Sequence, residues 1–173
     1  ELCSGRRVDV VDVARHRRLQ RLAHPLCGLL NSRDPVAQGY EPELRERVGP
    51  LRSSQVPIIW VEELLLQSVL MVGYPRALIA FTAWRKFGGV EPPPADPDMD
   101  YSRAAEWTRR GEEVCAVVYG ENYGKLRESV RLLHPAIDAW MVTEGYGRTL
   151  SRPGLDLKLR ELCTVAQTAV LEA

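Results

Sequence analysis

The most apolar stretch of the chain runs from Val61 to Phe87 and is interrupted once, at Gly73–Tyr74–Pro75. Before the interruption the hydrophobic side chains leave almost no polar face, and such a helix is normally buried between other helices. Glycine suits the position just past the end of one helix, and proline suits the first position of the next. The pattern therefore predicts two buried helices joined by a tight corner.

The second of these helices and the last part of the chain show narrower apolar stripes. Ala77, Leu78, Phe81 and Trp84 recur at three- and four-residue steps, which predicts a single packing face. A final helix is expected from Asp156 to the end of the chain. The residues that it is expected to bury are Leu159, Leu162, Val165, Ala166 and Ala169.

Helical periodicity extends over most of the remaining chain, and glycine and proline mark where each helix ends. Further helices are expected over residues 8–30, 41–47, 101–119, 123–133 and 136–144. We expect Gly49–Pro50 to close the helix at 41–47, and a loop to occupy residues 145–154. Because no stretch alternates with the two-residue period of a half-buried strand, the sequence predicts an all-α protein.

A proline-rich segment divides this series of helices. Residues 88–98 read GGVEPPPADPD, which favours an extended and rigid linker rather than a helix. The chain is therefore expected to consist of a first helical block over residues 1–87, a Pro-rich linker over 88–100 and a second helical block over 101–173.

The charge balance narrows the choice of partners. The chain of 173 residues holds 23 Lys and Arg and 23 Asp and Glu, which indicates no nucleic-acid partner and no anionic membrane surface. The apolar run before Gly73 is shorter than the roughly 20 residues that cross a bilayer, so no membrane span is expected. Apolar helices with little net charge favour burial between subunits, which predicts a homo-oligomer.

The cysteines indicate a reducing compartment. Four of them lie far apart, at Cys3, Cys27, Cys115 and Cys163. No Cys and His fall at the spacing of metal ligands, so we expect no metal and no cofactor, and we interpret the cysteines as unpaired thiols. The first residues are polar and lack the apolar core of a signal peptide, so the sequence predicts a cytoplasmic protein.

Two passages resemble a known family. Residues 146–147, 152–158, 160–162 and 164–166 resemble the opening signature of the carboxymuconolactone decarboxylase-like superfamily, which also contains the alkylhydroperoxidase D-like proteins. The apolar hairpin resembles the closing signature of the same superfamily, through Glu63, Leu66, Ser68, Gly73, Pro75, Ala77 and Ala80. The resemblance implies a helical bundle of that type.

The two signatures stand in the reverse of the family's order, because the closing one precedes the opening one in this chain. Two arrangements remain open. Residues 8–87 form a degenerate copy of the domain and residues 101–173 begin a second copy that is cut short, or a single domain is permuted.

The resemblance implies an enzyme that acts on a small lactone or carboxylate by acid and base chemistry, or on a peroxide through thiols. The peroxidase branch has a Cys-x-x-Cys pair followed by His, since one thiolate attacks the peroxide and the second resolves the sulfenic acid. No such pair occurs in this sequence before its last residue, Ala173. The redox centre is therefore expected to be absent or to lie beyond that residue. The alternative is a non-catalytic helical oligomer or small-ligand-binding relative.

The resemblance also selects candidate residues. Glu63 is a candidate proton carrier, although a carboxylate near the start of a helix is also stabilised by the helix dipole alone. Cys163 is a candidate thiol, although a lone cysteine more often packs in a core. Arg47 stands where the lactone-decarboxylating branch has His; it cannot act as a base, but it could bind a substrate carboxylate or simply pair with Glu43 and Glu46.

The remaining candidates flank the two glycine corners. If the corners approach one another, Tyr74, Arg76, Tyr146, Arg148 and Arg152 could line a pocket with donors for an anionic or carbonyl ligand. In the structural alternative, Arg152 and Arg160 pair with Asp156 and Glu161 around the nearby turn.

Overall fold

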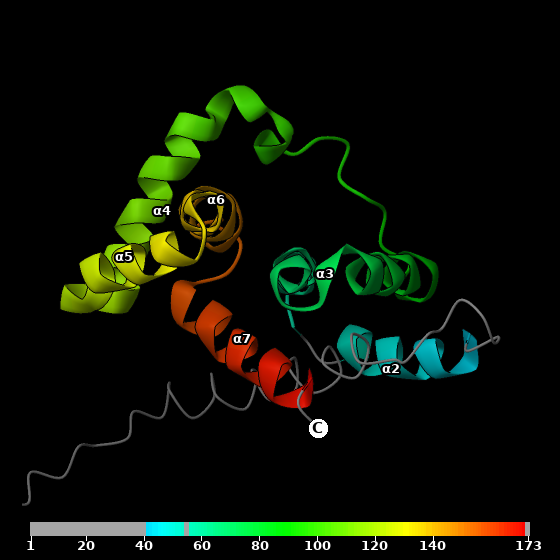
Figure 1. Cartoon of the computed structure of the whole chain (residues 1–173). Coiled ribbons are helices and arrows are strands. Elements are labelled where there is room, and N and C mark those ends of the chain that lie inside the picture. The colour runs from blue at the N-terminus through cyan, green and yellow to red at the C-terminus, as the bar shows by residue number, and fades with distance from the viewer. Residues whose placement is uncertain (1–40, 54–55, 172–173) are drawn as a thin grey trace, which may run out of the picture.

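The computed structural model of the chain describes residues 41–53 and 56–171. The helix expected over residues 8–30, together with Cys3 and Cys27, lies outside the described residues. Within the described ranges the chain forms helices and connecting segments and no strand, which confirms the all-α prediction. Figure 1 shows α2 and α3 on one side, α4, α5 and α6 on the other, and α7 returning toward the first pair.

Helix α3 (Ile58–Gly88) is the apolar hairpin that the sequence predicts. Its backbone leaves helical geometry at Gly73, where φ is 74° and ψ is 169°, a conformation that glycine adopts without the steric cost of a side chain. The two halves then fold against each other. Glu62 in the first half receives hydrogen bonds from Arg85 at 2.5 and 2.6 Å and from Trp84 Nε1 at 2.5 Å in the second half.

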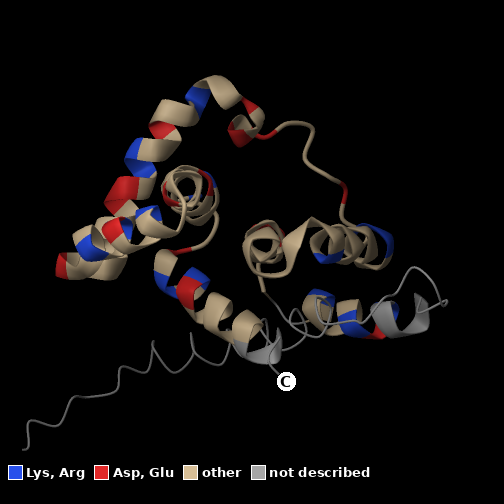
Figure 2. Cartoon of the chain, in the orientation of Figure 1, with Lys and Arg blue, Asp and Glu red and all other residues tan. Residues whose placement is uncertain are grey.

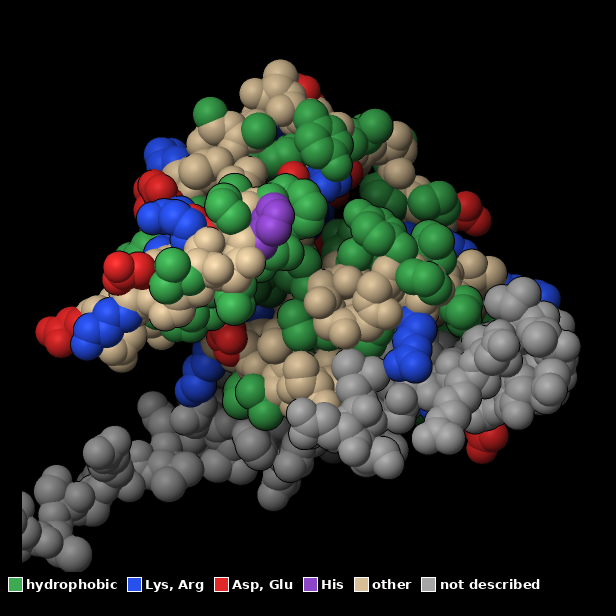
Figure 3. Space-filling view, viewed as in Figure 1, with side chains coloured by type: hydrophobic (Ala, Val, Ile, Leu, Met, Phe, Trp, Pro, Cys, Tyr) green, Lys and Arg blue, Asp and Glu red, His purple; other side chains and the backbone are tan. Residues whose placement is uncertain are grey.

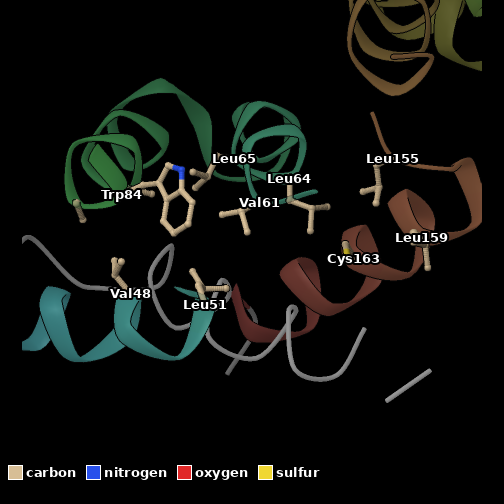
Figure 4. Packing of buried hydrophobic residues seen from close by; sticks show 11 residues of the cluster. Val48, Leu51, Val61, Leu64, Leu65, Trp84, Leu155, Leu159 and Cys163 are labelled. Carbon is tan, nitrogen blue, oxygen red and sulfur yellow. The ribbon is translucent and has the colours of Figure 1, made fainter. Parts of the chain in front are cut away.

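The hydrophobic core lies where this hairpin meets α2 (Glu41–Ser53) and α7 (Leu157–Leu171) (Figure 4). Its buried side chains come from all three helices and from the turn before α7: Val48, Leu51, Val61, Leu64, Leu65, Ala80, Ala83, Trp84, Leu155, Leu159 and Cys163. Each fully buried large side chain stabilises the fold by about 1.5–3 kcal/mol relative to an exposed one. This core holds the first block and the last helix together.

Helix α2 corrects the expectation that Gly49–Pro50 ends a helix at Arg47. The helix continues to Ser53, whose hydroxyl donates to the carbonyl oxygens of Gly49 at 3.1 Å and Pro50 at 3.3 Å. Val48 and Leu51 on either side of the proline are fully buried against α3. Burial of these two side chains outweighs the backbone hydrogen bond that proline removes.

The linker is non-helical over residues 89–96, as predicted, and then forms two single turns, η1 (Pro97–Met99) and η2 (Tyr101–Arg103). Helix α4 (Ala104–Tyr119) follows, and a short turn, η3 (Gly120–Asn122), leads to α5 (Tyr123–Leu133). The bounds of α5 are those expected from the sequence. The short helix α6 (Pro135–Trp140) completes the second layer.

The loop expected from Gly145 onward is wrong in its first half, because a π-helical segment, η4 (Met141–Leu150), runs through it. Gly147 serves close packing rather than a turn. A Cβ atom there would lie 1.9 Å from the carbonyl oxygen of Trp107, and one at Gly111 would lie 2.0 Å from that of Val142. The two glycines let the backbones of α4 and η4 touch.

Helix α7 begins one residue after Asp156, whose carboxylate accepts a hydrogen bond from Leu159 N at 3.1 Å. Three side chains expected to be buried are exposed: Leu78 at 61%, Leu162 at 42% and Val165 at 64%. In the second half of α3 the small Ala77, Ala80 and Ala83 face inward with Trp84, and Leu78 points away from the core. The apolar periodicity was therefore right for the helices and for part of each buried face, since Ala77, Trp84 and Leu159 are buried as expected.

By length and composition α3 could cross a membrane, and 33% of its most apolar window is buried within the protein. The core helix of a soluble protein passes the same test. Gly73 breaks the helix, so neither half reaches the roughly 20 residues that a single straight span requires.

Candidate functional site

Glu63 lies on the first half of α3 and is only 2% exposed. Its carboxylate accepts hydrogen bonds from Arg152 Nε at 3.1 Å to one oxygen and 3.0 Å to the other. A second guanidinium, that of Arg160, donates from Nη2 to Glu63 Oε2 at 2.7 Å. Two cations therefore occupy the only carboxylate that the sequence marks as a proton carrier.

Arg152 joins three segments that are distant in the chain. Besides Glu63 it binds Asp96, with Nη1 at 3.0 Å from Oδ1 and Nη2 at 2.6 Å from Oδ2, and Asp98, with Nη1 at 2.9 Å from Oδ2. The hydrogen bonds with Asp96 are the main reason that the pKa of Arg152 is raised, and those with Arg152 are the main reason that the pKa of Asp96 is lowered. We call Glu63, Asp96, Asp98, Arg152 and Arg160 the Arg152 network.

Asp98 connects this network to α4. It is 5% exposed and accepts hydrogen bonds from Trp107 Nε1 at 2.9 Å and Arg110 Nη2 at 3.1 Å. The backbone carbonyl of Asp98 accepts a further bond from Arg148 Nε at 3.1 Å. Figure 2 shows the acidic residues gathered where the linker meets the start of α4. The linker is thereby fixed to the second block.

Gly154 permits the loop before α7 to lie directly on Glu63. A Cβ atom at this glycine would come within 2.6 Å of Glu63 Cγ and 2.9 Å of Ile59 Cγ1. The close approach brings Arg152 and Arg160, on either side of the loop, to the same carboxylate. The hairpin and the segment before α7 thus contribute to one cluster.

A second polar group of residues lies between α3 and α7, and we call it the polar seam: Gln67, Arg160, Thr164 and Gln167. Gln67 Nε2 donates to Arg160 O at 2.8 Å and to Thr164 Oγ1 at 2.7 Å. Gln67 and Arg160 are 0% exposed, and Gln167 is 3% exposed. Burial lowers the pKa of the Arg160 guanidinium despite its ion pair with Glu63.

Several buried atoms of this seam have no hydrogen-bond partner among the described residues. They are Gln67 Oε1, Arg160 Nη1, Gln167 Nε2 and Gln167 Oε1. A buried polar atom without a partner costs about 1–3 kcal/mol, and native proteins contain few of them. The seam therefore holds several buried hydrogen-bonding atoms that the described residues leave without a partner.

The described cysteines lie in two different surroundings. Cys163 is 2% exposed within the hydrophobic core. Cys115 on α4 is 0% exposed, and burial raises the pKa of its thiol to about 11, although a hydrogen bond with Tyr123 opposes the shift. A thiol is nucleophilic as the thiolate, and the raised pKa of Cys115 disfavours that form at neutral pH.

Tyr146 pairs with a tyrosine that the sequence analysis did not select. Its hydroxyl lies 2.5 Å from that of Tyr119, and the two rings meet edge to face with centroids 5.7 Å apart. Burial, more than the bond with Tyr119, raises the pKa of Tyr146. Glu161 on α7 influences both Tyr146 and Cys115; its Oε1 is buried without a partner, and burial raises the pKa of its carboxyl.

Of the other candidates, only Arg148 has a described hydrogen bond to a member of the Arg152 network, the one to Asp98 O. Arg47 is half-buried on α2, and Arg76 is half-buried beyond the kink of α3. Tyr74 at the kink is 66% exposed. Arg148 lies over the rings of Tyr101 and Trp107, at 4.8 and 5.2 Å from their centroids.

The structural alternative for the two arginines named partners in the turn before α7, and the structure adds partners from other segments. Arg152 and Arg160 both bind Glu63, and Arg152 also binds Asp96 and Asp98. The linker aspartates were a signal in the sequence for these pairs, because acids within a proline-rich linker are placed rigidly enough to act as fixed partners. Nothing in the local sequence marks Gln67.

Among the described residues no three His, Cys, Asp or Glu side chains are grouped so that they could hold a metal ion. The fold and the site define an all-helical protein whose two blocks are joined by buried arginine–carboxylate pairs. Comparison with protein-family models, with curated proteins and with solved structures finds no match to this chain.

Proposed function

We propose that this chain is a helical protein of the carboxymuconolactone decarboxylase-like type that binds a small ligand and assembles as a homo-oligomer, without catalysis at Glu63. The resemblance of the two signatures supports the family. The residues around Glu63 support a function that does not use Glu63 for catalysis. It does not require the redox centre of the peroxidase branch.

The observation that carries the proposal is the double pairing of Glu63. Both carboxylate oxygens accept from guanidinium groups at 2.7–3.1 Å, and the residue is 2% exposed. A general base needs a free oxygen within reach of a substrate proton. Glu63 instead compensates the charges of Arg152 and Arg160, which is a structural role.

The two described thiols also favour this function over peroxide reduction. Cys115 lies on α4 and Cys163 on α7, and each is at most 2% exposed. Thiol peroxidase chemistry needs an accessible thiolate and a resolving thiol beside it. Neither requirement is met within residues 41–53 and 56–171.

Exposed hydrophobic side chains support assembly with further copies. Leu70, Tyr74 and Leu78 on α3 are 38–66% exposed, and Leu132 and Leu133 at the end of α5 exceed 80%. Figure 3 shows hydrophobic side chains gathered over α6 and α3 on one face. Large exposed apolar patches mark interaction sites. We also propose a cytoplasmic location, because the break at Gly73 and the buried Glu63 on the same helix suit a soluble helix.

A paired experiment tests the role of Glu63. If Glu63 is a counter-ion, Glu63→Gln lowers the free energy of unfolding by about 3 kcal/mol, since two buried arginines lose their charge partner. Urea unfolding measures this loss, and adding Arg160→Met to the variant recovers part of it. Glu113→Gln, in an exposed pair with Arg109, is the matched control and changes little.

The same proteins are assayed for hydroperoxide consumption with a dithiol donor. We expect none above the buffer rate. Turnover that Glu63→Gln abolishes while stability is retained would overturn the proposal and make Glu63 a proton carrier. A chain that sediments as a monomer of 19.5 kDa at high concentration would overturn the assembly.

One observation favours a second candidate, acid and base catalysis on a small lactone or carboxylate. Glu161 has a raised pKa and an unpartnered buried oxygen, and it lies in the electrostatic neighbourhood of the Tyr119–Tyr146 pair. Such a carboxyl holds its proton to a higher pH than an exposed glutamate does. Loss of lactone turnover in Glu161→Gln, with unchanged stability, would favour this second function.

A further inference from the structure

The polar seam between α3 and α7 carries more hydrogen-bonding capacity than its own residues use. Gln67 donates both amide hydrogens, one to Arg160 O and one to Thr164 Oγ1, and these two bonds fix the orientation of its side chain. Its carbonyl oxygen is then left buried and unpaired. The seam therefore presents a fixed acceptor that no described donor reaches.

Arg160 presents the complementary donor. Nε donates to Leu155 O at 3.1 Å, and Nη2 donates to Glu63 and to Arg152 O at 2.9 Å. Nη1 is buried with no partner. Glu63 is shared with Arg152, so the positive charge of Arg160 is compensated only in part. A buried, incompletely compensated guanidinium favours an anionic oxygen.

The side chains that carry the two unpaired atoms are neighbours, because Gln67 Nε2 donates to the backbone carbonyl oxygen of Arg160. Arg160 reaches Glu63, and Gln67 follows Glu63 by four residues on α3, a rise of about 5.4–6 Å along the helix. Gln167 lies one turn beyond Thr164 on α7 and offers both a donor and an acceptor without partners. Because these side chains are neighbours in a buried seam, a guest that joins them must be small.

We propose that the polar seam is a binding site for a small hydroxy-carboxylate, whose carboxylate accepts from Arg160 Nη1 and whose hydroxyl donates to Gln67 Oε1. Gln167 supplies additional hydrogen bonds at the far side of the guest. This site rests on the proposed ligand-binding function and gives that function a substrate class. It differs from the candidate pocket at the glycine corners, because neither Tyr74 nor Arg76 belongs to it.

Three probes that share one skeleton test the chemistry. Glycolate carries both required groups, acetate lacks the hydroxyl, and glycolamide lacks the charge. Titration calorimetry of the full chain is expected to show glycolate binding at least about tenfold more tightly than either analogue, because each lost contact leaves a buried group unpaired. Equal affinity for glycolate and acetate, or no binding of any of the three, overturns the site and leaves the unpaired atoms to buried water alone.

Gln167→Leu is the most informative variant. Gln167 makes no hydrogen bond that the variant would lose, and an apolar side chain of similar size relieves its unpaired atoms. We expect a melting temperature equal to or above that of the parent and glycolate binding weakened at least about fivefold. Unchanged glycolate affinity would remove Gln167 from the site.

Gln67→Leu is expected to remove the preference for glycolate over acetate, since the acceptor of the hydroxyl is gone. Nuclear magnetic resonance of the side-chain amides provides a readout independent of stability, because the Gln67 signals move on glycolate addition in the parent. Thr168→Ala, an exposed position on α7, is the control and leaves glycolate binding unchanged.

The two proposals fail separately. Dithiol-dependent hydroperoxide turnover would contradict the proposed function whatever the seam binds. Absence of glycolate binding, while another small ligand stabilises the protein, would contradict only the hydroxy-carboxylate site.

Discussion

Two faces of the first half of α3 are buried, but by opposite means. One side presents Val61, Leu64 and Leu65 to the hydrophobic core beneath the hairpin. The other presents Glu63 and Gln67 to the arginines and polar groups that precede and begin α7. The apolar face can pack against many different hydrophobic side chains, because hydrophobic contact has no direction. The polar face can bind only side chains with matching charge and hydrogen-bond geometry.

The two faces therefore contribute differently: the apolar face to the stability of the fold, and the polar face to the relative positions of the segments. The apolar contacts hold α2, α3 and α7 together, and shapes of similar volume could replace them. The Arg152 network joins α3, the linker and the loop before α7 at fixed positions, with hydrogen bonds to Asp96 and Asp98 across more than 50 residues of chain. Variants on each side therefore test whether charge or packing determines how the two blocks are placed.

The largest effect is expected from Arg152→Ala. It leaves Glu63, Asp96 and Asp98 with reduced compensation, and removal of one partner from buried ion pairs costs about 3–5 kcal/mol. Urea unfolding measures the loss of free energy. The matched control is Arg109→Ala, whose pair with Glu113 is 63% exposed on both sides, and which is expected to cost less than about 0.5 kcal/mol. Equal losses in the two variants would show that the network contributes no more than a surface pair.

On the apolar side, Leu64→Ala is expected to cost about 2–5 kcal/mol, since a fully buried leucine leaves a cavity in the core. Leu78→Ala on the same helix is the control, because that side chain is 61% exposed. Unfolding curves of the two variants give the difference. A large loss for Leu78 in dilute solution would mean that the exposed stripe is covered in an assembly.

Gly154→Ala probes the close contact between the loop and α3. The added methyl group would lie 2.6 Å from Glu63 Cγ, so either the loop or Glu63 must shift. Overpacking of this kind costs about 1–3 kcal/mol. Thermal unfolding measures the loss. Gly124→Ala on α5 is the control, because a methyl group there meets no atom within 4 Å, and it is expected to stabilise the helix slightly.

The sequence was sufficient where local chemistry decides the structure. Gly73–Tyr74–Pro75 predicted the corner of α3, and the apolar period with its flanking glycine and proline predicted α5 over Tyr123–Leu133. It was misleading where a distant surface decides. Pro50 signals a helix end, yet burial of Val48 and Leu51 carries α2 past it, and Gly147 signals a turn, yet it accommodates the Trp107 carbonyl.

The site shows the same division. Glu63 and Arg152 were selected as candidates, each from its own signature, but their pairing was not foreseen because 89 residues separate them. The linker was recognised by its prolines as a boundary, and its aspartates were not recognised as partners of Arg152. Which of several carboxylates pairs with Arg152 depends on the folded structure, and the hydrophobic periodicity of the sequence does not predict it.

The smallest expected effect is a decrease in the free energy of unfolding at low pH. It tests whether the charge of Asp96 helps to hold the linker. The hydrogen bonds from Arg152, more than any other influence, hold the pKa of Asp96 below its ordinary value of 3.8. A carboxyl whose folded-state pKa is depressed contributes stability above its unfolded pKa and loses it as the pH falls through the folded value. Stability is therefore expected to decrease below about pH 4. Because the Asp96 side chain is 33% exposed, solvent screening keeps this contribution below about 1 kcal/mol.

Urea unfolding of the parent and of Asp96→Asn between pH 3 and pH 6 measures the contribution of the Asp96 charge to the free energy of unfolding. Other carboxylates, such as Asp138 with its own arginine partners, titrate equally in both proteins and cancel in the comparison. The difference in unfolding free energy between the two is expected to be largest near pH 6 and to shrink toward pH 3. A difference that stays constant across the range would mean that Asp96 binds Arg152 without its charge mattering, and the linker would then be held mainly by Asp98, which is buried against Trp107.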